Sequence, residues 1–252
     1  MGIDSSLLIE TPWTVSALCM FGLLMVLAAT TLIGSLVAMV LGVAKSDTFG
    51  LFVRMLLGLV VTTVLYAIVK SGGQTSLIPL MIFGLVAFWM TPKQTTSTFK
   101  LMDLMDRKQF LFVLAASGIT FFLFLTLVLN FETGELRFLG AGESAQFIDF
   151  PFTVRAGQLL NFCGIESIST NFFDTSQLRP TPYHWLEIWF GALIYTLLPL
   201  NAEVLWSCVV NPVLFTILLV GIYGFLERIV GAKPFLGLMA FLILVVSGFG
   251  IL

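Results

Sequence analysis

Apolar runs long enough to cross a lipid bilayer constrain the fold of this chain more than any other feature. Such runs occupy about 13–44, 48–69, 109–131, 204–226 and 234–252, and a shorter one occupies 77–91. A helix needs roughly 20 apolar residues to cross ~30 Å of hydrocarbon. Only 10% of the residues are charged, against roughly 25% in soluble domains. The sequence therefore predicts an all-α fold, a polytopic transmembrane helical bundle, and excludes a water-soluble protein.

The sequence also lacks the motifs of several kinds of site that are common in soluble proteins. The chain has no dinucleotide-binding G-x-G-x-x-G turn, no Walker loop and no G-x-S-x-G nucleophile elbow. Its single histidine rules out an H-E-x-x-H zinc site, and Cys19, Cys163 and Cys208 are too dispersed to predict a disulfide framework. The net charge of −2 and the absence of a basic run argue against a nucleic-acid partner.

The segment 185–200 decides the topology. It is apolar but shorter than a usual span, with Glu187 near its start and Pro199 near its end. If it does not cross, one side of the membrane holds Lys45, Arg54, Lys93, Lys100, Arg107, Lys108, Arg228 and Lys233, and the other holds Lys70, Arg137, Arg155 and Arg179. If it crosses, Arg228 and Lys233 change sides, and neither side of the membrane then has an excess of basic residues. Because basic loops favour the cytoplasm, we expect six spans in the cytoplasmic (inner) membrane, with the N-terminus and the loop 132–184 extracytoplasmic.

These spans divide the chain into three parts. Residues 1–131 are predicted to form four transmembrane helices, with a cytoplasmic interfacial helix near 95–107 that could instead dock a partner. Residues 132–203 form the extracytoplasmic loop, and residues 204–252 form two further transmembrane helices. The Asn211-Pro212 pair should kink the first of these two helices, and Arg54, near one end of its span, is able to snorkel.

The sequence of the loop has the pattern of an amphipathic helix, and the loop is too rich in Phe and Leu to be disordered. Asp149 and Pro151 stand where a helix cap and a first turn belong, and Gly164 stands where a helix ends. An apolar face between them consists of Phe152, Ala156, Leu159, Leu160 and Cys163. We therefore expect a juxtamembrane amphipathic helix near 151–163 and a second one near 183–200, both on the membrane surface.

Three charged residues of the loop could serve a site. Asp149, at the head of a surface helix, could act as a general base towards a hydroxyl or hold a divalent cation. It could equally cap its helix, which is worth ~1 kcal/mol. Arg155 and Arg179 could clamp a phosphate, or could simply be solvated loop charges.

The only histidine, His184, marks the point where the loop becomes apolar. Glu187 follows three residues later and shares its helix face, so the two could bind a donor phosphate together. The alternative is that His184 is an interfacial anchor, beside Trp185 and Trp189 in an aromatic belt.

The motifs "DFPF", "GIES" and "TPYHWLEIWFGALI", which follow the apolar run 109–131, carry a family resemblance over roughly 109–226. The chain resembles the N-terminal part of GT-C-type membrane glycosyltransferases. Those enzymes have an extracytoplasmic loop built from juxtamembrane helices that bears an essential acid, which here would be Asp149. Members usually have about eight or more spans, so the resemblance implies that this chain is the N-terminal part of one, a truncated chain.

The resemblance implies transfer of a sugar from a polyprenyl-phosphate-linked donor on the extracytoplasmic side. Asp149 would be catalytic, and His184, Glu187, Arg155 and Arg179 would bind substrate. The partners would be the lipid bilayer and the lipid-linked sugar donor, alongside other membrane proteins, and a divalent cation is the one cofactor left open. The alternative is a non-catalytic assembly subunit or a transporter-like subunit; few ionisable residues lie within the clear spans, which argues against an ion pathway.

Overall fold

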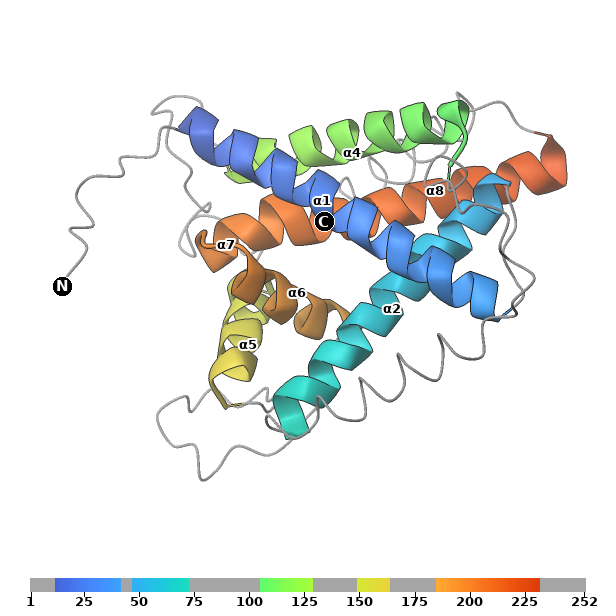
Figure 1. Cartoon of the computed structure of the whole chain (residues 1–252). Helices are drawn as coiled ribbons and strands as arrows, with labels where there is room; N and C mark the ends of the chain where they lie inside the picture. Colours follow the sequence, from blue (N-terminus) through green and yellow to red (C-terminus); the bar gives the residue numbers. More distant parts are fainter. Residues whose placement is uncertain (1–11, 42–46, 73–104, 129–148, 164–184, 232–252) are drawn as a thin grey trace.

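A computed structural model of the chain describes residues 12–41, 47–72, 105–128, 149–163 and 185–231 (Figure 1). Four helices in it are long and apolar enough to cross a membrane: Thr14–Val40, Thr48–Lys70, Arg107–Leu125 and Ala202–Ile229. They belong to α1 (Pro12–Val40), α2 (Thr48–Gly72), α4 (Arg107–Val128) and the consecutive elements α7 (Ala202–Leu205), η7 (Trp206–Val210) and α8 (Asn211–Val230). No strand occurs in these ranges, and the predicted all-α polytopic bundle is confirmed.

The last of the four helices is the centre of the bundle. In its most apolar stretch 67% of the residues are buried, against 39%, 33% and 44% in α1, α2 and α4. The main core gathers around it, with Leu205, Trp206, Val209, Val213 and Val220 all at or below 1% exposure. The other long helices therefore surround this helix and keep apolar faces on the outside of the bundle.

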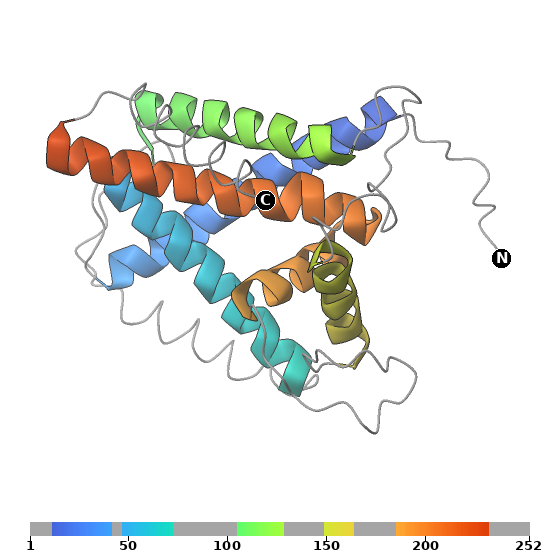
Figure 2. The ribbon, with the colours of Figure 1, turned by 180° about the vertical axis from the view of Figure 1, so that it is seen from behind.

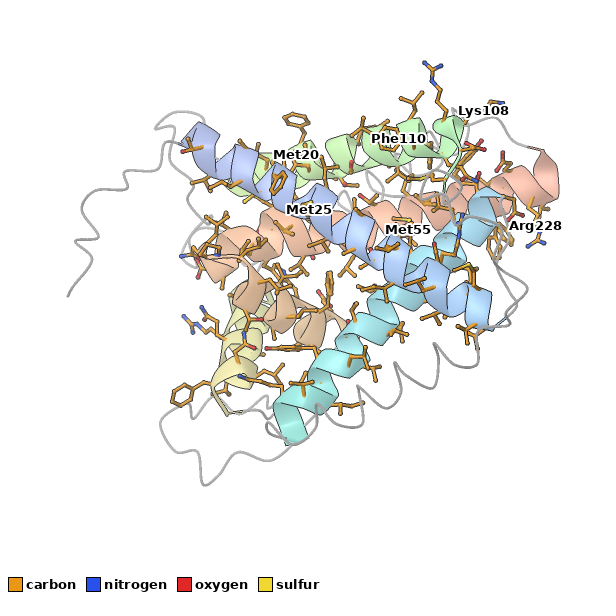
Figure 3. All side chains as sticks on the ribbon, viewed as in Figure 1. Met20, Met25, Met55, Lys108, Phe110 and Arg228 are labelled. Carbon is orange, nitrogen blue, oxygen red and sulfur yellow. The ribbon has the colours of Figure 1, made fainter. Side chains whose placement is uncertain are left out.

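The four long helices form two pairs that run in opposite directions. α1 and α8 run one way, and α2 and α4 run the other way, as both views show (Figures 1 and 2). The starts of α2 and α4 and the end of α8 meet at one end, where Thr48, Gln109 and Glu227 line a common pocket. Lys108 and Arg228 lie at this same end (Figure 3). Because α8 runs antiparallel to α4, the end of α4 and the start of α7 lie at the same end of the bundle.

Local hydrogen bonds set the helix ends in this charged region. The carboxylate of Asp47 accepts from the Gly50 N–H at 2.8 Å and caps α2. Asp106 accepts from the Gln109 N–H at 2.7 Å, and its own N–H donates to the Gln109 side chain at 3.2 Å. This reciprocal capping box begins α4. Gly231, at φ 64°, ends α8 in the left-handed conformation that glycine adopts without strain.

The predicted kink at Asn211-Pro212 takes the form of a π turn. The helix widens over Trp206–Val210, and the Asn211 N–H reaches back five residues to the Trp206 carbonyl. Pro212 follows as the second residue of α8 and supplies no N–H to the turn before it. The wider turn absorbs the proline while the span remains continuous.

The long loop contains two short helices, α5 (Asp149–Cys163) and α6 (Trp185–Leu197). The sequence predicts them near 151–163 and 183–200. They lie beside the second half of α2, at the end of the bundle away from the charged pocket (Figures 1 and 2). The predicted runs 77–91 and 234–252 lie outside the described residues, as does most of the interfacial helix near 95–107. Met105 and Asp106, which lie directly before α4, are not helical, and Asp106 caps α4.

Candidate functional site

Three of the five residues predicted to form the site, Asp149, Arg155 and Glu187, fall on two helices that touch each other. Asp149 is the first residue of α5, and Glu187 lies in the first turn of α6, where it is half-buried. Arg155 is exposed on α5. His184 and Arg179, together with the side chain of Asp149, lie outside the described part of the chain. The structure thus brings together the helices that begin near Asp149 and Glu187.

α5 is buried along the face that its sequence pattern predicts. Ala156, Leu159 and Leu160 of that face are 2%, 8% and 0% exposed, and Val154 joins them at 1%. Phe162 points away and is 85% exposed. The helix therefore uses its apolar face to pack on protein, and leaves Arg155 and Phe162 on the outside.

Two glycines allow α6 to pack closely, one against α5 and the other against the π turn. A β-carbon added at Gly157 would lie 2.9 Å from Cε2 of Tyr195, and one added at Gly191 would lie 2.8 Å from Cζ3 of Trp206. The ring of Tyr195 thus occupies the space beside Gly157, and the indole of Trp206 occupies the space beside Gly191. This arrangement joins α5, α6 and the π turn into one corner.

A polar contact fastens this corner to α2. The Tyr66 hydroxyl donates to the side-chain oxygen of Asn161, and the Asn161 amide donates to the Ala192 carbonyl at 2.9 Å. The ring of Tyr66 meets Trp189 edge-on, with centroids 6.4 Å apart and planes at 73°. Leu160 fills the same small core. One residue from each of α2, α5 and α6 therefore holds the loop helices against the bundle.

The predicted aromatic-belt position of Trp189 is wrong. Its side chain is 6% exposed, because α6 turns it into the core beneath Tyr66 and Leu160. A belt residue would present its ring to the membrane interface. This part of α6 is therefore held by protein contacts.

Among the residues that the structure describes, two hydroxyls in this region have no hydrogen-bond partner. They belong to Tyr195 on α6 and Ser207 in the π turn, and both oxygens are fully buried. Burial, followed by the charge of Glu187, raises the pKa of Tyr195 above its ordinary value, so its phenol keeps its proton and can donate. Sequence reasoning missed Tyr195, although Glu187, Gly191 and Tyr195 recur every four residues and so lie on one helix face.

A second polar region lies at the opposite end of the bundle. A pocket of about 160 Å³ is lined by Asp47, Thr48, Asp106, Gln109, Gly224, Glu227 and Arg228. Most of these charges already have a structural role. Asp47 and Asp106 cap helices, Glu227 accepts from the Tyr223 hydroxyl at 3.3 Å, and Arg228 lies 3.9 Å from Asp47.

Arg54 near this pocket does not snorkel to solvent. It is 6% exposed, and its Nε donates to the Gly50 carbonyl at 3.3 Å, one turn back along α2. The backbone of α1 covers this part of α2, because Gly34 sits directly against the Arg54 carbonyl. The predicted snorkelling is wrong, since protein encloses the side chain.

Within the described residues, no group of three or more His, Cys, Asp or Glu side chains could hold a metal ion. The side chain of Asp149, which the sequence offers as a ligand for a divalent cation, lies outside the described residues. No protein-family model, curated protein or solved structure matches this chain.

Proposed function

We propose that the chain is a GT-C-type membrane glycosyltransferase, or the N-terminal part of one. It would transfer a sugar from a polyprenyl-phosphate-linked donor on the extracytoplasmic side of the inner membrane. One observation carries this proposal: the helices of the long loop fold on each other and on α2, at the end of the bundle remote from most of its charges. A loop that served only as a connector would need no such attachment.

The roles of the loop residues follow from this placement. Asp149, at the head of α5, would accept a proton from the acceptor hydroxyl or hold a divalent cation. Arg155 is exposed on the same helix and free of the core, as a group that binds a donor phosphate must be. Glu187, with His184 and Arg179 from the neighbouring segment, would complete the binding of the donor.

The orientation belongs to the same proposal. The end that carries Arg107, Lys108 and Arg228 would face the cytoplasm, because basic residues are retained there. Since α5 and α6 lie towards the other end, the loop would then face outward, where lipid-linked sugars are used by the enzymes that the sequence resembles.

A second candidate is a transporter-like or assembly subunit. The observation in its favour is the polar pocket between α2, α4 and α8, with the buried Arg54 in the same region of α2. An ionisable side chain enclosed near the end of a span is a common feature of transport pathways. Variants of Arg54 would then impair function, whereas variants of Asp149 would not.

The test compares glycolipids from cells that express the parent chain, Asp149→Asn or Glu203→Gln. Glu203 is an exposed acid at the start of α7 and serves as a matched control for the loss of one carboxylate. We expect Asp149→Asn to lower product by roughly 10²- to 10⁴-fold, the usual contribution of a general base, and Glu203→Gln to leave it unchanged. Equal product from all three chains, at equal protein levels, would remove the catalytic role of Asp149.

A further inference from the structure

The pocket at the charged end of the bundle lies where three membrane spans end. Thr48 is the first residue of one span, Gln109 lies in the first turn of a second, and Glu227 lies in the last turn of a third. Lipid head groups occupy the layer just outside the hydrocarbon. The side chains of Asp47 and Arg228 in the pocket wall are 43% and 45% exposed. The pocket is therefore open at the level of the head groups.

This pocket is large enough for a small organic group. Its volume is about 160 Å³, whereas a single water molecule needs roughly 10–15 Å³. The described lining residues include three carboxylates, from Asp47, Asp106 and Glu227, and one guanidinium, from Arg228. The guanidinium lies to one side, over the ring of Phe49 at 5.4 Å from its centroid. The excess of negative charge favours a ligand with a positive group.

Two of these carboxylates have an oxygen that can still accept a hydrogen bond. Asp106 uses one oxygen for the Gln109 N–H, and Glu227 uses one for the Tyr223 hydroxyl. Within the described part of the chain the second oxygen of each has no donor. No three carboxylates among the described residues could share a metal ion. Separate acceptors of this kind suit an ammonium group, which donates in three directions.

The hydroxyl of Thr48 points to a ligand independently of the charges. Thr48 lines the pocket and is only 5% exposed. No hydrogen bond joins its hydroxyl to any residue that the structure describes. Most buried polar groups in folded proteins are paired, so a hydroxyl in this position is available to a group that enters the pocket.

We infer that this pocket binds the head group of a phospholipid that ends in a primary amine, as phosphatidylethanolamine does. The ammonium donates to Asp106, Glu227 and Thr48, and the phosphate accepts from Arg228. Lys108, exposed at the same end of the bundle, adds a second cation for the phosphate (Figure 3). A choline head group has no N–H donor, and a glycerol head group has no positive charge. This site is separate from the loop helices and goes beyond the proposed function.

The test measures lipid binding to the purified full chain by native mass spectrometry. The probes are phosphatidylethanolamine, phosphatidylcholine and phosphatidylglycerol with the same acyl chains, and free ethanolamine as a competitor. The proteins are the parent, Glu227→Gln and Thr48→Val, with Glu203→Gln and Thr62→Val as matched controls. Glu203 is an exposed acid at the opposite end of the bundle, and the Thr62 hydroxyl bonds to carbonyls of its own helix.

We expect the parent to bind phosphatidylethanolamine at least tenfold more tightly than the other two lipids. Glu227→Gln keeps an oxygen for the Tyr223 hydroxyl but loses the charge, and should reduce this preference about tenfold. Thr48→Val should reduce it about fivefold without lowering the thermal unfolding midpoint, since it breaks no bond between described residues. Both control variants should keep the preference of the parent.

Equal binding of the three lipids by the parent would overturn the inference. A preference that survives in Thr48→Val would also overturn it, and this variant decides the result if Glu227→Gln lowers the unfolding midpoint. Free ethanolamine that displaces the lipid at equal concentration would assign the pocket to a soluble amine instead of a lipid. None of these results changes the cellular products of Asp149→Asn, by which the proposed function is judged.

Discussion

Gly34 of α1 and Gly58 of α2 lie against each other's helix backbone, and this reciprocal contact brings the two helices close together. A β-carbon added at Gly34 would lie 1.6 Å from the Arg54 carbonyl oxygen. One added at Gly58 would lie 1.8 Å from the carbonyl oxygen of Thr30. Neither position can hold any side chain while the helices remain in place, and small residues at such crossings are what allows membrane helices to associate closely.

Substitution of alanine for either glycine should therefore force α1 and α2 apart. We expect Gly34→Ala or Gly58→Ala to destabilise the protein by about 2 kcal/mol or more, because the obstacle is backbone that cannot rotate away. Thermal unfolding in detergent micelles measures this loss.

The matched control is Gly118→Ala in α4, where an added β-carbon meets nothing within 4 Å. Alanine there should be neutral or should stabilise by roughly 0.5–1 kcal/mol, the ordinary gain in a helix interior. Equal effects at Gly34 and Gly118 would show that α1 and α2 do not cross as described.

The long helices could be predicted from the sequence, because a bilayer demands ~20 consecutive apolar residues and few charges. α2 begins at Thr48 and α4 at Arg107, within two residues of the apolar runs that predict them. The crossing at Gly34 and Gly58 could not be predicted. Small residues recur along both helices, and hydropathy does not say which of them face a neighbour and which face lipid.

The candidate site was predictable only in part. The cap-like Asp149 and Pro151 and the apolar face after them predict α5, because that helix is amphipathic. α6 is apolar on nearly every side, so its sequence does not reveal that Trp189 faces the Tyr66 core or that Tyr195 faces α5. Those orientations depend on the tertiary contacts of Gly157 and Gly191, which lie far apart in the sequence.

The hydroxyls of Thr120 and Thr216 join α4 to α8 at 2.9 Å, and we expect this bond to contribute little. Thr120 keeps bonds to the carbonyls of Ala116 and Ser117 in its own helix, at 3.0 and 3.1 Å, when Thr216 is replaced. Thr216→Val should cost about 0.6 kcal/mol, the average for such bonds between membrane helices.

A double-mutant cycle with Thr120→Val isolates the coupling of this pair. Thr62→Val is the control, since the bonds of Thr62 within the described part of the chain go to the Gly58 and Leu59 carbonyls of its own helix. A coupling energy near zero would argue that the two hydroxyls do not meet.

Asn161 holds the loop helices to the bundle, so its removal should loosen them. Asn161→Leu removes the acceptor of the Tyr66 hydroxyl and the side-chain donor to the Ala192 carbonyl, which should cost roughly 1–3 kcal/mol. Limited proteolysis within 129–184 should become faster before the rest of the bundle unfolds. Gln158→Leu, at an exposed position of the same helix, should leave the cleavage rate unchanged.

The proposed orientation can be tested with single cysteines at the two ends of the molecule. Lys108 is exposed in the first turn of α4, and Phe162 is 85% exposed at the far end of α5. In a chain with Cys163→Ser, Cys19 and Cys208 remain buried and should not react. A membrane-impermeant maleimide applied to intact cells should label Phe162→Cys, and should label Lys108→Cys only after permeabilisation, because basic ends are retained in the cytoplasm. The reverse pattern would place the loop in the cytoplasm and end the proposal of a transferase that acts outside it.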